Sequence, residues 1–160
     1  MVDLNKIIQA KRTIANFVRN TELYESKKLS VLSGAEVFVK RENLQRTGAY
    51  KIRGAYNKIA HLSEEQKQGG VIAASAGNHA QGVALSAREF GVRAVIVMPE
   101  STPLLKVIGT KNLGAEVILK GNNFDEAYAY AVEYANENNL VFVHPFNDEL
   151  IQAGQGTIAL

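Results

Sequence analysis

From residue 70 onward, short apolar runs alternate with longer stretches that have helical periodicity. The apolar runs have the length and composition of buried strands, and they are VIAAS (71–75), RAVIVM (93–98), AEVILK (115–120) and VFVHP (141–145). Strands without a polar face, separated by helices, indicate an α/β fold with an open parallel sheet flanked by helices. Ligands bind such sheets beyond the carboxyl ends of the strands. Chemistry is therefore expected in the loops after Ser75, Met98, Lys120 and His144.

The helices between these strands have recognisable ends. The first follows AGNHAQG and should stop at Gly91, and the second should begin at Pro103 and close at Gly114. The third covers 124–138, with a stripe of side chains formed by Phe124, Ala127, Ala131 and Tyr134.

The first part of the chain follows a different pattern. An amphipathic helix is predicted near the N-terminus, and its apolar face carries Ile7, Ile8, Ile14 and Phe17. ELYES (22–26) and EVFVKREN (36–43) are strand candidates, with a short helical turn at KKLSVLSG (27–34) between them. These segments are assigned to part of a second lobe, with a boundary near 45–55.

Composition excludes several classes of function. The net charge is only +2 and no block of Lys or Arg stands out, so we expect no nucleic-acid partner. The charged N-terminal segment is neither a signal peptide nor a membrane span, so no membrane association is expected. The absence of cysteine excludes disulfides and thiolate chemistry and fits a reducing compartment.

The loop SAGNHAQG, residues 75–82, joins the first strand of the alternating unit to its helix. Its small residues let the backbone approach a ligand, and free N–H groups near Asn78 and His79 can hold a carboxylate or a phosphate. An ordinary strand–helix turn capped by asparagine explains the same residues equally well. The glycine spacing does not match the dinucleotide-binding fingerprint.

Lys51 lies in TGAYKIRGAYNK, residues 47–58, between two tyrosines and flanked by glycines. A lone lysine is most often a solvated surface charge. An amine that forms a Schiff base with a carbonyl cofactor must instead be neutral, through burial or a neighbouring cation. Arg53 is the nearby cation, and Tyr50 and Tyr56 are candidates for apolar walls. Local features alone favour the surface interpretation.

Other candidate sites have less support. No acidic residues at metal-ligand spacing join the three histidines, so no metal site is predicted at His61, His79 or His144. The surroundings of Ser75 do not form a nucleophile elbow, which argues against a Ser/His/Asp hydrolase.

Taken together, these segments resemble one family. KRENLQRTGAYKIRGAYNK (40–58) is similar to the cofactor-lysine segment of the threonine dehydratases (threonine ammonia-lyases), which use pyridoxal phosphate. ASAGNHAQGVA (74–84) is similar to their substrate-carboxylate loop, and MPESTPLLKV, GAEV and HPFNDELIQAGQGTIAL continue the match in order. The resemblance implies the tryptophan-synthase-beta-like fold, which is fold type II of the pyridoxal phosphate enzymes. It also implies three regions: the N-terminal part of a large cofactor domain (1–50), a small α/β lobe (51–147) and a truncated return into the large domain (148–160).

The resemblance implies roles for individual residues. Lys51 would form the Schiff base with pyridoxal 5'-phosphate and then act as the catalytic base. Tyr50 would pack against the cofactor ring, and Asn78 would hydrogen-bond its phenolic oxygen. The substrate carboxylate would be held by Ser75, Ala76, Gly77, Asn78 and His79.

The implied reaction is an α,β-elimination that converts L-threonine, and also L-serine, to a 2-oxo acid and ammonia. The resemblance further implies a cytoplasmic homo-oligomer that acts on a small amino acid, with isoleucine biosynthesis as an expected setting.

The sequence departs from the family in several places. Ala49 and Tyr50 stand where the family usually has serine and phenylalanine, and Thr21-Glu22-Leu23 stands where it has Thr-Pro-Leu. AGQGTIAL begins a helical pattern that no residue caps, so an incomplete N-terminal portion is expected. In the family, a glycine-rich loop that binds the phosphate and a small polar residue that contacts the pyridine nitrogen are expected later in the sequence than residue 160. We therefore expect these 160 residues alone to bind the cofactor weakly, with little or no turnover.

Three other functions stay open. A serine racemase of the same fold has a second catalytic serine where this chain has Ala76, and alanine cannot take a proton, so elimination is favoured. A non-catalytic α/β module that binds a small anion or nucleotide would use the same loop. An isolated lobe used for assembly, or misassembled as a swapped oligomer, would expose apolar surface.

Overall fold

The computed structural model describes residues 1–160. Its elements, in chain order, are α1 (Leu4–Ile14), β1 (Leu23–Glu25), α2 (Lys27–Ser33), β2 (Phe38–Lys40), the 3-10 turn η1 (Glu42–Leu44), α3 (Lys51–Ala60), α4 (Glu64–Gly69), β3 (Val71–Ala74), α5 (Asn78–Glu89), β4 (Ala94–Met98), α6 (Leu104–Asn112), β5 (Glu116–Leu119), α7 (Phe124–Glu137), β6 (Val141–Phe142), α8 (Glu149–Gly156) and the 3-10 turn η2 (Thr157–Ala159).

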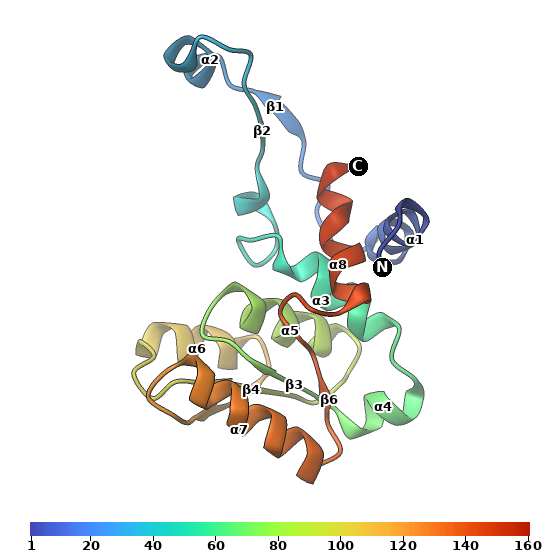
Figure 1. Cartoon of the computed structure of the whole chain (residues 1–160), viewed down its shortest axis with the longest axis vertical. Helices are drawn as coiled ribbons and strands as arrows, with labels where there is room; N and C mark the ends of the chain where they lie inside the picture. Colours follow the sequence, from blue (N-terminus) through green and yellow to red (C-terminus); the bar gives the residue numbers. More distant parts are fainter.

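A four-stranded parallel sheet with the order β5–β4–β3–β6 forms the centre of the α/β part (Figure 1). The predicted fold class and the positions of the four strands are confirmed, although β6 is shorter than the predicted 141–145. The chain builds outward from β3 through β4 to β5 and then returns to place β6 on the other side of β3. The carboxyl ends of β3 and β6 therefore meet at a topological switch point, where open α/β sheets bind ligands.

Alternate residues of β3 pack on opposite faces of the sheet. Val71 and Ala73 belong to the apolar cluster that includes the buried face of α5, whereas Ile72 and Ala74 belong to the cluster that includes α7. Every residue of β3 and β4 is buried, which explains why both runs lack a polar face in the sequence. The α7 residues that contribute to the core are small, namely Ala127, Ala131 and Ala135, and Phe124 of the predicted stripe is exposed.

Helix α3 is enclosed between α5 and α8 (Figure 1). A Cβ atom added at Gly82 of α5 would lie 3.2 Å from the backbone carbon of Lys51. A Cβ atom added at Gly154 of α8 would lie 2.6 Å from both the carbonyl oxygen of Arg53 and the Cα of Gly54. Glycine at these positions lets the backbones of both neighbouring helices touch α3.

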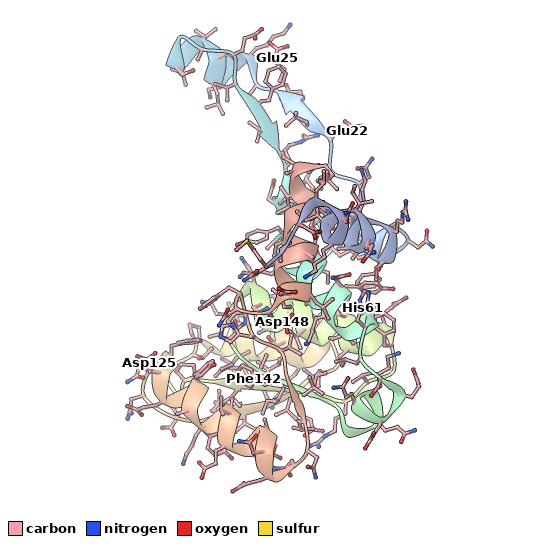
Figure 2. All side chains as sticks on the ribbon, turned by 45° about the vertical axis from the view of Figure 1, so that its right-hand side comes forward. Glu22, Glu25, His61, Asp125, Phe142 and Asp148 are labelled. Carbon is pink, nitrogen blue, oxygen red and sulfur yellow. The ribbon has the colours of Figure 1, made fainter.

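The segment β1–α2–β2 forms an arm that extends away from the rest of the molecule (Figure 1). Its two strands pair in antiparallel fashion, and Glu22 and Glu25 mark its course in Figure 2. No residue of α2 is buried, and the apolar side chains of Val31 and Leu32 are 83% and 74% exposed. The two strands and the helical turn expected in this part of the chain are therefore present, but they contribute almost nothing to the core. None of the helices is both long and apolar enough to cross a membrane.

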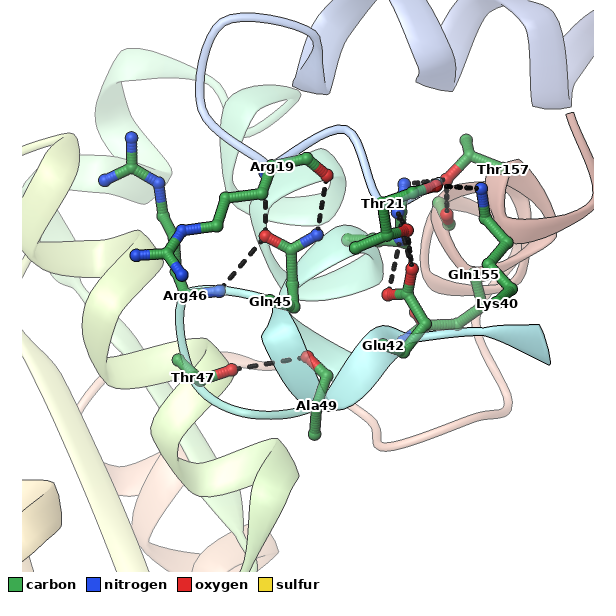
Figure 3. Close-up of polar contacts among 12 residues, drawn as sticks. Arg19, Thr21, Lys40, Glu42, Gln45, Arg46, Thr47, Ala49, Gln155 and Thr157 are labelled. Atoms are coloured by element: carbon green, nitrogen blue, oxygen red, sulfur yellow. Dashed lines mark hydrogen bonds and ion pairs between the residues drawn. The ribbon is translucent and has the colours of Figure 1, made fainter. Parts of the chain in front are cut away.

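A buried polar network around Arg53 joins the base of this arm to α3 and to the 3-10 turn η2. Figure 3 shows its members Thr21, Glu42 and Thr157. The guanidinium of Arg53 donates to both carboxylate oxygens of Glu42, from Nε at 2.9 Å and from Nη2 at 2.7 Å. It also donates to the hydroxyl oxygens of Thr21 and Thr157, at 3.2 and 3.3 Å. Burial acts to raise the pKa of Glu42, but hydrogen bonds from Arg53 and Thr21 outweigh it and hold that pKa below its ordinary value.

The contact between α3 and α8 predicts that Gly154→Ala destabilises the fold. The added methyl group would meet only backbone atoms, which cannot rotate away, so we expect a loss of about 1–3 kcal/mol in the free energy of unfolding. Gly109 of α6 is the matched control, because no atom lies within 4 Å of its Cβ position. Gly109→Ala should be neutral or should stabilise by up to about 1 kcal/mol. Urea unfolding of both variants tests this, and equal midpoints would contradict the close contact.

The Arg53–Glu42 pair predicts a specific loss of stability in acid. Because the folded state lowers the pKa of Glu42, the contribution of this residue is fully present above its unfolded pKa and is lost as the pH falls through the folded value. Glu42→Gln should cost about 1–3 kcal/mol at neutral pH and should weaken the dependence of stability on pH in the acid range. Urea midpoints between about pH 3 and pH 7 measure this. Exposed Glu36 provides the control, and Glu36→Gln should keep the wild-type profile.

Candidate active site

Lys51 is the first residue of α3, and its amine points to the carboxyl edge of the sheet. Its Nζ donates a hydrogen bond to the carbonyl oxygen of Pro145, at 2.8 Å, just beyond the end of β6. The same nitrogen lies 5.6 Å from the centre of the Tyr50 ring. The side chain is half-buried, and burial lowers the pKa of Lys51 below its ordinary value. The amine is therefore more easily deprotonated than that of a solvated lysine.

The two neighbours that the sequence suggested, Arg53 and Tyr56, do not lower the pKa of Lys51. Arg53 faces Glu42 inside the buried network, and the lowering at Lys51 comes from burial rather than from a nearby cation. Tyr56 stacks on Phe17 with ring centres 4.2 Å apart and also packs against Phe90. The expectation that Arg53 and Tyr56 shape the surroundings of the amine is wrong, because successive helical residues point in different directions.

The loop after β3 leaves the start of α5 open. Gly77 precedes the first helical residue, and no side chain caps the helix there, so the interpretation of an asparagine-capped turn is wrong. The N–H of Gly77 donates to Oγ of Ser75 at 3.2 Å, which folds the loop back on itself. No atom lies within 4 Å of the Cβ position of Gly77, and Asn78 is exposed. The first N–H groups of a twelve-residue helix are therefore free to bind an anion.

His79 faces the interior, in contrast to Asn78. Its side chain is only 3% exposed, and Nε2 lies 2.8 Å from the carbonyl oxygen of Val143. Its Nδ1 is buried and has no hydrogen-bond partner. Burial lowers the pKa of His79 to about 4, and the nearby charge of Lys51 acts in the same direction. The imidazole is consequently neutral at physiological pH.

The segment that follows β6 is held at several points. Nδ1 of His144 accepts hydrogen bonds from the backbone N–H groups of Phe146 and Asn147, at 3.1 and 2.8 Å. The carboxylate of Asp148 caps α8 and forms an ion pair of 2.7 Å with Lys58 of α3. Figure 2 shows Asp148 at the junction between the sheet layer and α8.

The structure brings the predicted site residues together with two backbone groups at the carboxyl edge of the sheet. Lys51 and the loop 75–79 lie together at the carboxyl edge, because Gly82 brings α5 into contact with α3. Chemistry was expected in the loop after His144, but the contacts that the Val143 and Pro145 carbonyl groups make with His79 and Lys51 had not been predicted. The available signal was the proline itself, since a residue without an N–H group cannot continue a strand ladder.

These residues fit a planar aldehyde that carries negative charge. Burial lowers the pKa of the Lys51 amine, which favours the neutral form used in carbonyl addition, and an aromatic face lies beside it. The uncapped start of α5 can receive an anionic group. No group of three or more His, Cys, Asp or Glu side chains is placed to hold a metal ion.

Comparison with known proteins agrees with this chemistry. Residues 14–160 match the family described as pyridoxal-phosphate dependent enzyme. Over its whole length the chain is 59% identical to the L-threonine ammonia-lyase of Thermotoga maritima, of which it covers 40%. The processed form of threonine deaminase isoform 2 from Solanum lycopersicum superposes with a TM-score of 0.89 and 40% identity, over 98% of this chain and 44% of that one. A serine racemase from maize superposes with a TM-score of 0.93 and 36% identity, over 98% of this chain and 48% of that one.

This chain spans less than half the length of each of these relatives. The family match nevertheless includes α3 with Lys51, the loop 75–79 and the whole parallel sheet. On this match and on the chemistry of the site, the chain belongs to the family of pyridoxal-phosphate dependent enzymes.

Proposed function

We propose that this chain supplies the cofactor lysine and the carboxylate-binding loop of an enzyme that deaminates L-threonine, and also L-serine. The products are a 2-oxo acid and ammonia, formed by α,β-elimination. One observation carries the proposal: the half-buried amine of Lys51, with its lowered pKa, lies beside the uncapped start of α5. The 59% identity to the Thermotoga maritima L-threonine ammonia-lyase supports this choice of substrate.

Three residues would hold the cofactor, pyridoxal 5'-phosphate. Lys51 would attach to it through its amine, the ring of Tyr50 would face it, and the exposed amide of Asn78 would donate to one of its oxygens. When bound, this cofactor supplies an electron sink that makes the Cα–H bond of an amino acid acidic.

The chain's own groups would orient the substrate and move its protons. The free N–H groups at the start of α5 would hold the carboxylate, so that the Cα–H bond points in a defined direction. Lys51, released when the substrate amine takes its place, would take the proton from Cα, and its lowered pKa favours the neutral amine that this role needs. Water leaves from the β-carbon, and hydrolysis then releases ammonia, so that threonine gives 2-oxobutyrate.

A serine racemase is the second candidate, because the maize enzyme superposes with a TM-score of 0.93. Racemisation requires a proton to be delivered to the opposite face of Cα. Ala76 lies in the loop next to Ser75 and has no group that can carry a proton. This residue favours elimination over racemisation.

The proposal extends to the organisation of the chain. Residues 51–147 would form a small lobe, and residues 1–50 and 148–160 would belong to a large domain. The packing of α1 against α8, on the side of α3 away from the sheet, supports this division (Figure 1). A cytoplasmic homo-oligomer, with isoleucine biosynthesis as its setting, is part of the same proposal.

Reductive trapping tests the role of Lys51. The chain is incubated with increasing pyridoxal 5'-phosphate and reduced with borohydride, and the modified lysines are then located by mass spectrometry of peptides. Lys51 should acquire the phosphopyridoxyl group at the lowest concentrations, because its lowered pKa leaves more of the amine neutral. Lys58 of the same helix, paired with Asp148, serves as the internal comparison. Labelling of Lys58 before Lys51, or equal labelling of all lysines, would contradict the proposal.

A chimaera tests the reaction. The 160 residues are joined to the part of the Thermotoga maritima L-threonine ammonia-lyase that follows the matched region. The chimaera should release 2-oxobutyrate and ammonia from L-threonine, whereas the 160 residues alone should show little or no turnover. Lys51→Ala in the chimaera should lower kcat by at least about 10³-fold, because it removes both the attachment point and the base.

The same chimaera separates the two candidate functions. With L-serine it should form pyruvate and no substantial D-serine. Substantial D-serine would favour the racemase, and normal ammonia release by the 160 residues alone would contradict the expected dependence on the remaining part.

A further inference from the structure

Two side chains from different helices reach the same short segment of backbone. Lys51 of α3 donates to the carbonyl of Pro145, and the ring of His79 of α5 contacts the carbonyl of Val143. These two carbonyl groups are separated by His144 alone. The segment 143–145 therefore links the loop at the start of α5 to the amine at the start of α3.

The tautomer of His79 follows from its partner. A carbonyl oxygen can only accept a hydrogen bond, so Nε2 must carry the hydrogen, and Nδ1 must be the bare nitrogen. Nδ1 has no partner and is buried, which makes protonation there unfavourable. The titratable groups that act on the ring are Lys51 and His144, and both lower its pKa. The ring is consequently a fixed, neutral donor at physiological pH.

The backbone hydrogen bonds of the sheet end before Pro145. The N–H of Val143 donates to the carbonyl of Ile72 at 2.8 Å, and the pairing of β6 with β3 ends there. Pro145 has no N–H group with which to continue the ladder. On the C-terminal side of Pro145, the His144 ring holds the N–H groups of Phe146 and Asn147. On the strand side, His79 contributes the side-chain hydrogen bond, at the Val143 carbonyl.

We propose that His79 is a positioning residue: its imidazole holds the Val143 carbonyl and thereby keeps the Pro145 carbonyl against the amine of Lys51. The inference rests on the proposed function only in taking Lys51 as the reactive amine. In this inference the side chain of His79 holds the Val143 carbonyl. In the proposed function the backbone N–H of the same residue would hold the substrate carboxylate.

Competitive labelling of the 160-residue chain tests this without cofactor. Trace acetic anhydride is applied over a range of pH, and the labelled fraction of Lys51 is measured by peptide mass spectrometry, with exposed Lys111 as the reference for reagent reactivity. In the wild type, half-maximal labelling of Lys51 should fall below the ordinary pH for a solvated lysine. His79→Leu should release the segment, expose the amine to water and move that midpoint upward. When both proteins are labelled at one pH below their midpoints, a tenfold weaker labelling of the variant corresponds to a midpoint about one pH unit higher.

Two variants separate positioning from a general loss of stability. His79→Gln retains an N–H donor of similar reach and should keep most of the wild-type labelling profile of Lys51. Ser86→Ala removes another buried polar group of α5 that has no partner, and it should leave the profile unchanged. An unchanged profile in a folded His79→Leu variant would overturn the proposal, as would equally displaced midpoints in the Gln and Leu variants.

The wild-type chain provides a measurement that does not depend on folding of a variant. Two-bond ¹H–¹⁵N correlation spectra at neutral pH should show the hydrogen of His79 on Nε2 and a bare Nδ1. The opposite tautomer, or a protonated ring, would overturn the proposal. Neither experiment contains pyridoxal phosphate. A result that overturns the role of His79 would therefore not decide whether borohydride traps the cofactor on Lys51, which tests the proposed function separately.

Discussion

The site depends on the enclosure of helix α3 by two other helices. Six of the ten α3 residues are buried, and glycines of both neighbouring helices touch its backbone, Gly82 from one side and Gly154 from the other. Packing of this density leaves α3 no freedom to rotate or slide. The first residue of the helix, Lys51, is therefore delivered to a defined place at the carboxyl edge of the sheet, where parallel strands bind ligands.

Enclosure also explains why the amine of Lys51 loses its proton more easily than that of a solvated lysine. A charged ammonium group loses hydration when it is half-buried, and its proton becomes easier to remove. The nearby start of α5 carries partial positive charge, because its N–H groups are uncapped, and it favours a negatively charged ligand. The same packing thus places the Lys51 amine close to a helix start that favours anions, which is the combination that the proposed function requires.

Some parts of this arrangement could be predicted from the sequence, and others could not. The central strands β3 and β4 were predictable because they are buried on both faces and therefore read as continuous apolar runs, and the half-buried edge strands β5 and β6 followed from the same alternation with helices. Helix α4 was missed because EEQKQG has no apolar stripe, although the capping box of Ser63 and Gln66 was a readable signal. The burial of Lys51 could not be predicted from the residues around it in the sequence. The residues that contact it, Gly82 and Pro145, are distant along the chain. Only the resemblance of whole segments to a known family selected this lysine over a surface lysine.

The crossing of α3 and α8 has a consequence for how this protein can change during evolution. Gly54 and Gly154 face each other there. An added methyl group at Gly154 would meet only backbone atoms of α3, and one at Gly54 would meet the carbonyl oxygen of Ile151 as well as the Gln155 side chain. An overfilled contact between two side chains can be relieved when the partner becomes smaller. No substitution can relieve the contacts here, because the blocking backbone atoms are present in every residue type. We therefore expect no compensating pair of substitutions at these two positions, and each glycine must be retained independently for as long as the two helices cross at this point.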